Sequence, residues 1–196
     1  MFLLCLLLAL PLYLSAQAPA DSLPREKRWF VPDGAVVQHA GNMGYVAIGP
    51  SYDLGQEKLL LDVLYGYVPR FEAEEELHLI TLKPVYQPQK VALGDKYSLT
   101  PLRIGLGLSY YFGDQFSIRW DDSYPDGYYW WPTSLRLLGY AGAAVSRKFE
   151  AAKAIQEVSL YSELGTYDLI VTQWVKDSHL SAWDIINVSV GVRVAF

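Results

Sequence analysis

Two residues near the C-terminus are of the types that together perform nucleophilic chemistry. His179 and Ser181 are two positions apart, so on an extended segment both side chains project from one face. The imidazole could then take the proton of the serine hydroxyl, provided that a carboxylate orients it; Glu163, Asp177 and Asp184 are the nearby choices. The alternative is an exposed polar loop that contains both residues by coincidence. We favour the loop, because three-residue matches are common and catalytic sites are judged by geometry.

Metal and nucleotide sites are not indicated by the sequence. The three histidines, His39, His78 and His179, are scattered, and there is neither an HExxH motif nor a glycine-rich loop that opens a helix. The single cysteine, Cys5, lies in the first apolar run, so no disulfide framework or thiolate metal site is expected. We therefore predict no metal and no cofactor.

The start of the chain has the layout of an export signal. Residues 2–14 are apolar apart from one tyrosine hydroxyl, and small residues follow before the polar Asp21. This run is shorter than the roughly 20 residues that a membrane-spanning helix needs, and its layout is typical of a signal peptide. We predict a signal peptide over residues 1–16, cleaved after Ala16, and a short periplasmic segment over residues 17–28.

Composition narrows the class of the exported part. Of the 196 residues, 52% are hydrophobic and 14% aromatic, whereas 19% are charged. A disordered or coiled-coil protein would be charge-rich and aromatic-poor, so both classes are excluded. The formal net charge is −5, which argues against nucleic acid as a partner.

The rest of the chain alternates with a period of two. From Thr100 to Phe112, apolar side chains alternate with small or polar ones, and this places Thr100 on the same face as Leu102. Short and long connections also alternate along the chain, which is typical of bacterial transmembrane barrels. Eight strands are predicted, approximately at residues 29–40, 44–53, 58–68, 77–89, 97–113, 132–147, 155–165 and 184–196.

These patterns predict an all-β fold, namely an eight-stranded antiparallel transmembrane β-barrel over residues 29–196. The face opposite the apolar one carries charge that a sandwich core would rarely accept but that a barrel lumen can pair. An eight-stranded barrel is just wide enough to be filled by side chains, so we expect a salt-bridged plug. A narrow pore, or a soluble exported sandwich or lipocalin-like barrel, remains open. Six charged residues are predicted to face the lumen: Asp62, Lys83, Arg103, Glu157, Glu163 and Arg193.

The leader, the eight segments and a last strand that ends in Val194, Ala195 and Phe196 resemble the small outer-membrane β-barrels of Gram-negative bacteria. The resemblance is one of architecture, which hosts many functions. It implies an integral protein of the cell outer membrane that contacts outer-membrane lipid and lipopolysaccharide. It also implies that the barrel assembly machinery recognises the terminal Phe196. We expect a monomer.

Two segments outside the predicted strands invite further interpretation. Asp121, Asp122 and Asp126 could bind a divalent cation that bridges lipopolysaccharide phosphates. We favour an interfacial aromatic belt for the four residues that follow them, because Trp and Tyr prefer the headgroup level. Residues 167–175 could form a short amphipathic helix on the membrane or a strand extension. We read Glu57 as a solvated turn charge. The belt residues are Tyr128, Tyr129, Trp130 and Trp131, and residues 127–131 also resemble a barrel family to which no function is attached.

His179 and Ser181 are similar to the catalytic pair of the lipid A deacylase family, in which a His and a Ser share this spacing near the C-terminus. In this chain Ala182 stands where that family usually has Asn, and no Glu follows His179. The resemblance therefore extends to two residues, with Glu163 as one candidate for the third. We expect a non-enzymatic barrel with a structural or interaction role through its outer loops. The alternatives are a lipid-modifying hydrolase that uses Ser181 and His179, and a narrow pore.

Overall fold

The structure is a computed structural model of the 196-residue chain. It describes residues 30–113, 116, 134–149, 154–176, 181 and 183–196. The chain divides into residues 1–30 and residues 31–196, and the second unit contains every described helix and strand. The predicted signal peptide and the segment 17–28 lie outside the described residues.

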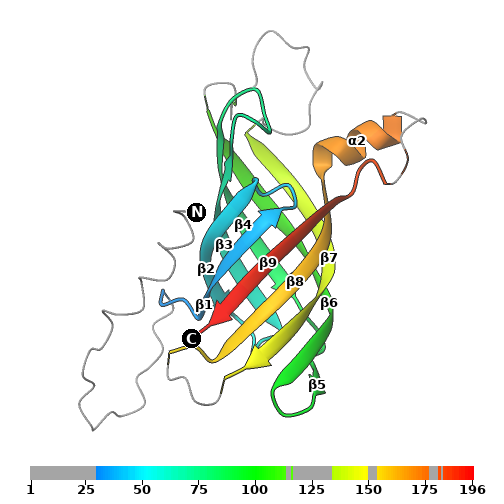
Figure 1. The fold of residues 1–196 in the computed structure, drawn as a ribbon. Helices are drawn as coiled ribbons and strands as arrows, with labels where there is room; N and C mark the ends of the chain where they lie inside the picture. The colour runs from blue at the N-terminus through cyan, green and yellow to red at the C-terminus, as the bar shows by residue number, and fades with distance from the viewer. Residues whose placement is uncertain (1–29, 114–115, 117–133, 150–153, 177–180, 182) are drawn as a thin grey trace. The chain divides into compact units, whose positions relative to one another are not determined.

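Eight strands form the wall of a closed barrel (Figure 1). Neighbouring strands are antiparallel, and the pairings of β1 with β9 and of β4 with β6 close the sheet. The predicted all-β, eight-stranded antiparallel β-barrel is therefore confirmed. The wall consists of β1 (Gly34–Ala40), β2 (Val46–Asp53), β3 (Leu59–Val68), β4 (Leu77–Tyr86), β6 (Tyr97–Phe112), β7 (Leu135–Lys148), β8 (Glu157–Tyr167) and β9 (Asn187–Ala195).

The strand bounds differ from the predicted ones at several ends. β1 begins five residues later than predicted, after Pro32, and β4 ends before Pro88; proline has no N–H for the ladder. β9 begins at Asn187, because residues 183–185 form a turn. A short strand, β5 (Val91–Leu93), pairs with β6 where only a turn was predicted, and Gly94, with φ +80°, permits the tight reversal between them.

A β-bulge interrupts the alternation in β6. The register with β7 shifts between Thr100 and Arg103. Both of these side chains are buried in the interior, whereas Pro101 and Leu102 between them are exposed. The prediction that Thr100 shares the outer face with Leu102 is wrong, because strict alternation cannot include the extra residue of a bulge.

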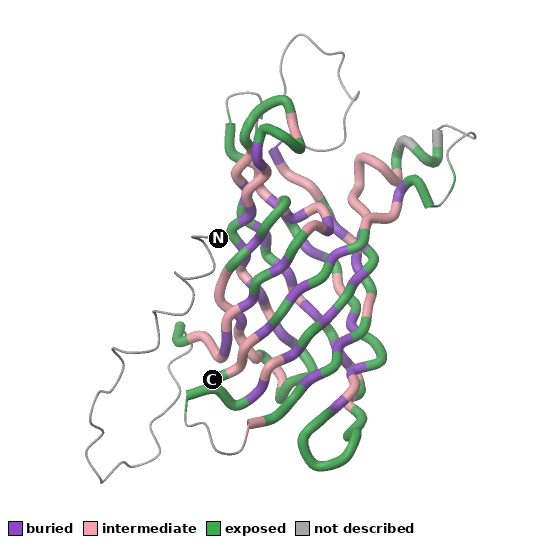
Figure 2. Tube along the Cα trace, in the orientation of Figure 1, coloured by how far each residue is buried: buried purple, intermediate pink, exposed green. Residues whose placement is uncertain are grey.

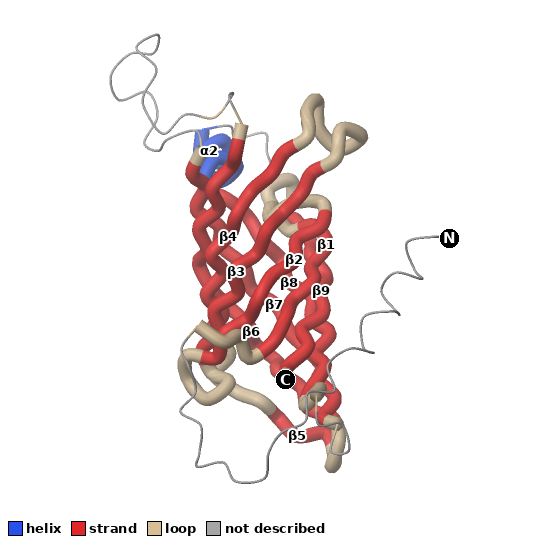
Figure 3. The backbone as a smooth tube through the Cα atoms, turned by 90° about the vertical axis from the view of Figure 1, so that its left-hand side faces the viewer, coloured by secondary structure: helices blue, strands red, loops and turns tan. Residues whose placement is uncertain are grey.

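The two ends of the barrel carry connections of different length (Figure 3). The turn end holds the connections at residues 54–58, 87–96 and 149–156 and the C-terminus; the loop end holds those at residues 41–45, 69–76, 113–134 and 168–186. The helix α2 (Asp168–Lys176) follows β8 at the loop end, so the helix forms rather than a strand extension. No helix in the described ranges is long and apolar enough to cross a bilayer.

Apart from the bulge in β6, buried and more exposed positions alternate along the strands of the wall (Figure 2), and many large apolar side chains are exposed. Leu106 on β6 is 66% exposed and Leu160 on β8 is 56% exposed. The interior contains an apolar cluster that includes Leu60 and Leu138, but more of the buried side chains are polar or charged than apolar. This distribution is the reverse of that in a soluble domain, where large polar side chains are rarely buried.

Glycine on the inner face makes room for one large interior side chain. Tyr161 on β8 is 1% exposed and faces Gly191 on β9, and a Cβ atom at position 191 would overlap the Tyr161 ring. The ring cannot turn aside freely, because its hydroxyl donates a hydrogen bond to Oε1 of Gln38 on the far side of β9. Gly191 is therefore a steric requirement of the filled interior.

We predict that Gly191→Ala lowers the free energy of unfolding by about 1–3 kcal/mol, the usual cost of overpacking. The matched control is Gly139→Ala on β7, where the nearest atom to an added Cβ is 3.7 Å away, an ordinary contact. Its effect should stay within about 0.5 kcal/mol. Urea unfolding of the two variants, followed by tryptophan fluorescence, measures the difference. Equal effects would contradict the packing of Tyr161 against Gly191.

Candidate functional site

The six charged residues predicted to face the lumen are all buried in the barrel interior. Their exposed fractions range from 0% for Asp62 and Lys83 to 8% for Glu157. They lie on β3, β4, β6, β8 and β9, so they approach one another from several sides of the barrel. The interior of the barrel is therefore the candidate functional site.

Glu163 on β8 is the centre of the interior cluster. Its Oε2 atom lies 2.5 Å from Nζ of Lys83 on β4, and its Oε1 atom lies 3.2 Å from Nε of Arg103 on β6. Glu163 and Lys83 are at most 1% exposed, and Arg103 is 2% exposed. One carboxylate thus pairs with two cations, which leaves the trio with a net positive charge, and it joins three strands, β4, β6 and β8. This is the condition under which buried charge is tolerated.

Polar and aromatic side chains surround the two cations, and Nη2 of Arg103 is buried without a hydrogen-bond partner among the described residues. Lys83 Nζ also donates to Oε1 of Gln38 on β1 at 2.6 Å, and it lies 4.8 Å from the ring centre of Tyr161. The guanidinium of Arg103 lies 4.5 Å from the same ring, and Lys83 lies 5.1 Å from the ring of Tyr140. Cation–π contacts of this kind are strongest where water is excluded. The cluster therefore fills the cross-section as well as pairing charge.

A second ion-paired cluster lies toward the turn end. Lys90, in the connection after β4, is 2.8 Å from a carboxylate oxygen of Glu57 and 2.7 Å from one of Glu157. Burial alone would lower the pKa of Lys90, but its hydrogen bonds to Glu157 and Glu57 outweigh burial and raise the pKa above its usual value. Gln87 joins the two clusters, since it accepts a hydrogen bond from Arg103 and donates one to the Glu57 carbonyl. Glu57 is therefore part of this cluster, and its side chain is also 57% exposed, as expected for a solvated turn charge.

Arg193 and Asp62 are the last two of the six charged residues predicted to face the lumen. Nε of Arg193 on β9 donates to Oγ of Ser51 on β2 at 2.8 Å. Asp62 is opposite Ser51 on one side and Lys83 on the other in the strand register. It forms no direct ion pair with a described residue, so its charge acts on the cations of the interior from a short distance.

The space left in the interior narrows from the turn end inward. A cavity of about 250 Å³ opens at that end between Asp53, Lys148 and the C-terminal Phe196. Deeper, among Gln87, Arg103 and their neighbours, a gap of about 10 Å³ remains, which is room for roughly one water. Within the described part of the chain, the Lys83–Glu163–Arg103 cluster fills the interior next to this gap.

The structure describes only some of the predicted hydrolase residues, and of these Ser181 and Glu163 lie apart. Ser181 is exposed in the connection before β9, whereas Glu163 is held in the interior by Lys83 and Arg103. Asp184 accepts the Ser181 N–H at 2.8 Å, and hydrogen bonds from the Ser181 backbone and side chain lower the pKa of Asp184. These contacts form a local turn. His179 lies outside the described residues, as does Asp177.

The remaining predicted site residues are separate from the interior. Tyr128, Tyr129, Trp130 and Trp131 lie outside the described residues, as do the three aspartates before them. Phe196 is 51% exposed, and its N–H donates to the Asp33 carbonyl at 2.9 Å. In the ranges that the structure describes, no group of three or more histidine or carboxylate side chains is placed to hold a metal ion.

Sequence reasoning missed several members of the interior cluster. Gln38 and Tyr161 are uncharged, but alternation would have found them: Tyr161 is two residues from Glu163, and Gln38 is two from the buried Val36. Gln87 and Lys90 lie in an irregular connection, where period two makes no prediction.

The fold and the interior together define a class, a closed eight-stranded antiparallel β-barrel whose lumen is filled by ion-paired side chains. Such a barrel is consistent with the outer-membrane type. No protein-family model matches the sequence, and comparisons with curated proteins and with solved structures give no significant match.

We predict that Glu163→Gln lowers the free energy of unfolding by about 3–5 kcal/mol, because it keeps the shape of the side chain but leaves Lys83 and Arg103 without their counter-charge. Glu76→Gln is the control, since Glu76 pairs with Arg70 at 3.8 Å on an exposed loop. The control should cost no more than about 1 kcal/mol. Urea titrations of both variants in the same detergent measure the two costs. Similar costs would mean that Glu163 does not organise the interior.

Proposed function

We propose that this chain is an integral outer-membrane β-barrel that acts without catalysis, as a rigid frame for the connections at its loop end. The observation that carries the proposal is the inverted distribution of side chains: an outer surface of exposed leucine, isoleucine and valine around an interior of paired charge. A bilayer is the environment in which that distribution is stable, because lipid accepts the apolar outside and each wall strand of the closed sheet is paired with both of its neighbours.

The ion-paired interior supports a frame rather than a pore. A conducting channel needs a continuous aqueous path, whereas the gap near Arg103 holds about one water. The Glu163 cluster ties β4, β6 and β8 together across the lumen, which opposes deformation of the wall. A wall that does not deform holds the ends of the loops at constant separations, as display of a binding surface requires.

The orientation of this frame in a membrane indicates which partners the chain would contact. The long connections emerge at the end opposite the C-terminus, which in outer-membrane barrels is the cell exterior. Outer-membrane lipid would cover the sides, and lipopolysaccharide would surround the loops. The exposed Phe196 at the end of β9 is available to the barrel assembly machinery. A closed sheet has no free edge along the wall, which favours a monomer.

We predict that Leu106→Arg lowers the stability of the barrel in phosphatidylcholine vesicles by about 2–4 kcal/mol, because it places a guanidinium against acyl chains. Val91→Arg is the control; Val91 is also exposed, but it lies on β5, outside the eight-stranded wall. Its cost should be at most about 1 kcal/mol. Urea titration in vesicles, checked by heat-modifiable gel mobility, gives both values. A soluble chain that needs neither detergent nor lipid would contradict the membrane proposal.

We predict that the lipids of the outer membrane are unchanged by this protein. Mass spectra should be identical for cells that express the chain, cells that express His179→Ala or Ser181→Ala, and cells that express neither. The reason is that Ser181 is held by Asp184 in a turn, apart from Glu163. The loss of one acyl chain, abolished in both variants, would instead establish the lipid-modifying hydrolase and overturn the non-enzymatic role.

A further inference from the structure

The helix α2 projects from the loop end of the barrel and is attached to the wall near its beginning (Figure 1). It contacts only the neighbouring β7 and β8 substantially. Oδ1 of Asp168, the first helical residue, accepts the Leu137 N–H at 3.2 Å. Toward the other end of the helix, Trp174 is 41% exposed and Val175 is 75% exposed. The helix is thus anchored at one end, and toward the other end the side chains of Trp174 and Val175 are exposed.

Most apolar residues of α2 occupy one side of the helix. Ile170, Val171, Trp174 and Val175 recur with the i, i+1, i+4, i+5 spacing of a single face, whereas Thr172 lies beside that face and Leu169 lies on the opposite side. Thr172 is exposed, and its hydroxyl donates to the Asp168 carbonyl of the same helix. A short helix with this division is suited to an interface between water and an apolar phase.

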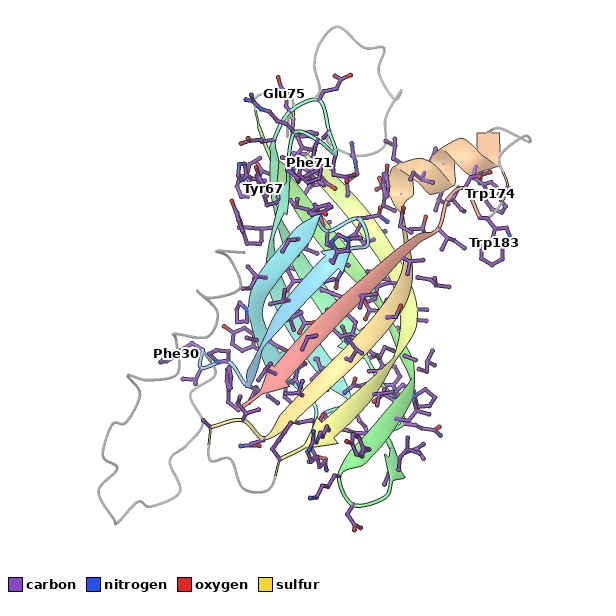
Figure 4. The ribbon with its side chains drawn as sticks, in the orientation of Figure 1. Phe30, Tyr67, Phe71, Glu75, Trp174 and Trp183 are labelled. Atoms are coloured by element: carbon purple, nitrogen blue, oxygen red, sulfur yellow. The ribbon has the colours of Figure 1, made fainter. Side chains whose placement is uncertain are left out.

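The returning chain adds a second aromatic residue to this face. Trp183, in the connection between α2 and β9, is 78% exposed. Figure 4 shows Trp183 on the same side of the barrel as Trp174, outside the wall. Two exposed tryptophans near one apolar helix face would be costly in water, whereas tryptophan is favoured at the headgroup level of a bilayer.

The apolar face is continuous with the outer surface of the wall. Near the end of β8, Leu164 faces outward and is 47% exposed, and near the start of β9, Val188 faces outward and is 57% exposed. These two residues are direct partners in the strand register. The helix and Trp183 therefore begin and end in the surface that the proposed membrane covers, and this continuity identifies lipid as the occupant.

We propose that α2 and Trp183 form a hydrophobic arm that inserts among the acyl chains of the leaflet at the loop end. The inference rests on the proposed membrane function. Its binding partner is the hydrocarbon just below the headgroups, reached by Trp174, Val175 and Trp183. The arm would set the depth of the barrel and give it one distinct lipid-contacting side, which a symmetric wall cannot do.

The test places a nitroxide label at one of three exposed positions, in full chains that carry Cys5→Ser. Val175→Cys reports on the arm, Leu160→Cys on the wall, and Glu75→Cys on a polar loop at the same end of the barrel. Each chain is reconstituted into phosphatidylcholine vesicles that contain no other protein. Collision of the label with oxygen, which concentrates in hydrocarbon, is compared with collision with a water-soluble nickel complex.

We predict that the ratio of oxygen to nickel accessibility is several-fold higher at positions 175 and 160 than at position 75. Trp174→Ser combined with Trp183→Ser should return the ratio at 175 toward that at 75. Phe71→Ser, which changes another exposed aromatic residue of the loop end, should not change it.

The other outcomes separate the two proposals. A high ratio at 160 with a low ratio at 175 would overturn the arm and leave the membrane barrel intact. Low ratios at both positions would overturn the membrane barrel itself. A label at 175 that is shielded from both reagents would mean that a second copy of the chain covers the helix, and this also overturns insertion into lipid.

Discussion

The structure depends on one carboxylate shared by two buried cations. Glu163 lies within 2.5 Å of Lys83 and 3.2 Å of Arg103, deep in a space too narrow for a hydration shell. Any one of the three would be very costly alone, because an unpaired buried charge loses its solvation without compensation. Together they make the inside of an eight-stranded barrel compatible with charge. The closed wall, the glycine opposite Tyr161 and the hydrogen bonds of Gln38 all help to hold these three side chains in place.

The filled interior and the apolar exterior are consequences of the same geometry. Eight strands enclose a cross-section that side chains can just fill, and a lipid-facing wall must put its polar residues inside. Polar side chains that fill the lumen must then satisfy one another, which explains why the clusters around Glu163 and Lys90 are joined through Gln87. A frame built in this way resists deformation of its cross-section. Variation in structure is therefore confined to the connections at the ends of the barrel.

Most of the fold could be predicted from the sequence, because side chains along a barrel strand point alternately to the outside and to the interior of the barrel. Period two located all eight wall strands and turned Asp62, Arg103 and Arg193 inward. It failed at Thr100, where the bulge departs from alternation, and it made no prediction for Lys90, which lies in a connection whose path depends on contacts distant in sequence. Which inward charges pair with one another was also beyond prediction, since pairing depends on the stagger of strands as far apart as β4 and β8.

The two ends of the barrel have different physical tasks. At the turn end, short connections and the Lys90 cluster tie β4 to β8 through Glu57 and Glu157, so that end adds to the rigidity of the frame. At the loop end, the chain between β8 and β9 forms a helix whose apolar side is not folded back into the protein. An isolated helix of nine residues is marginal in water, so the apolar face of α2 needs an apolar environment to remain ordered. Under the proposed membrane function, the nearest such environment is the lipid beside the wall, and α2 would extend the contact of the frame with the bilayer at the loop end.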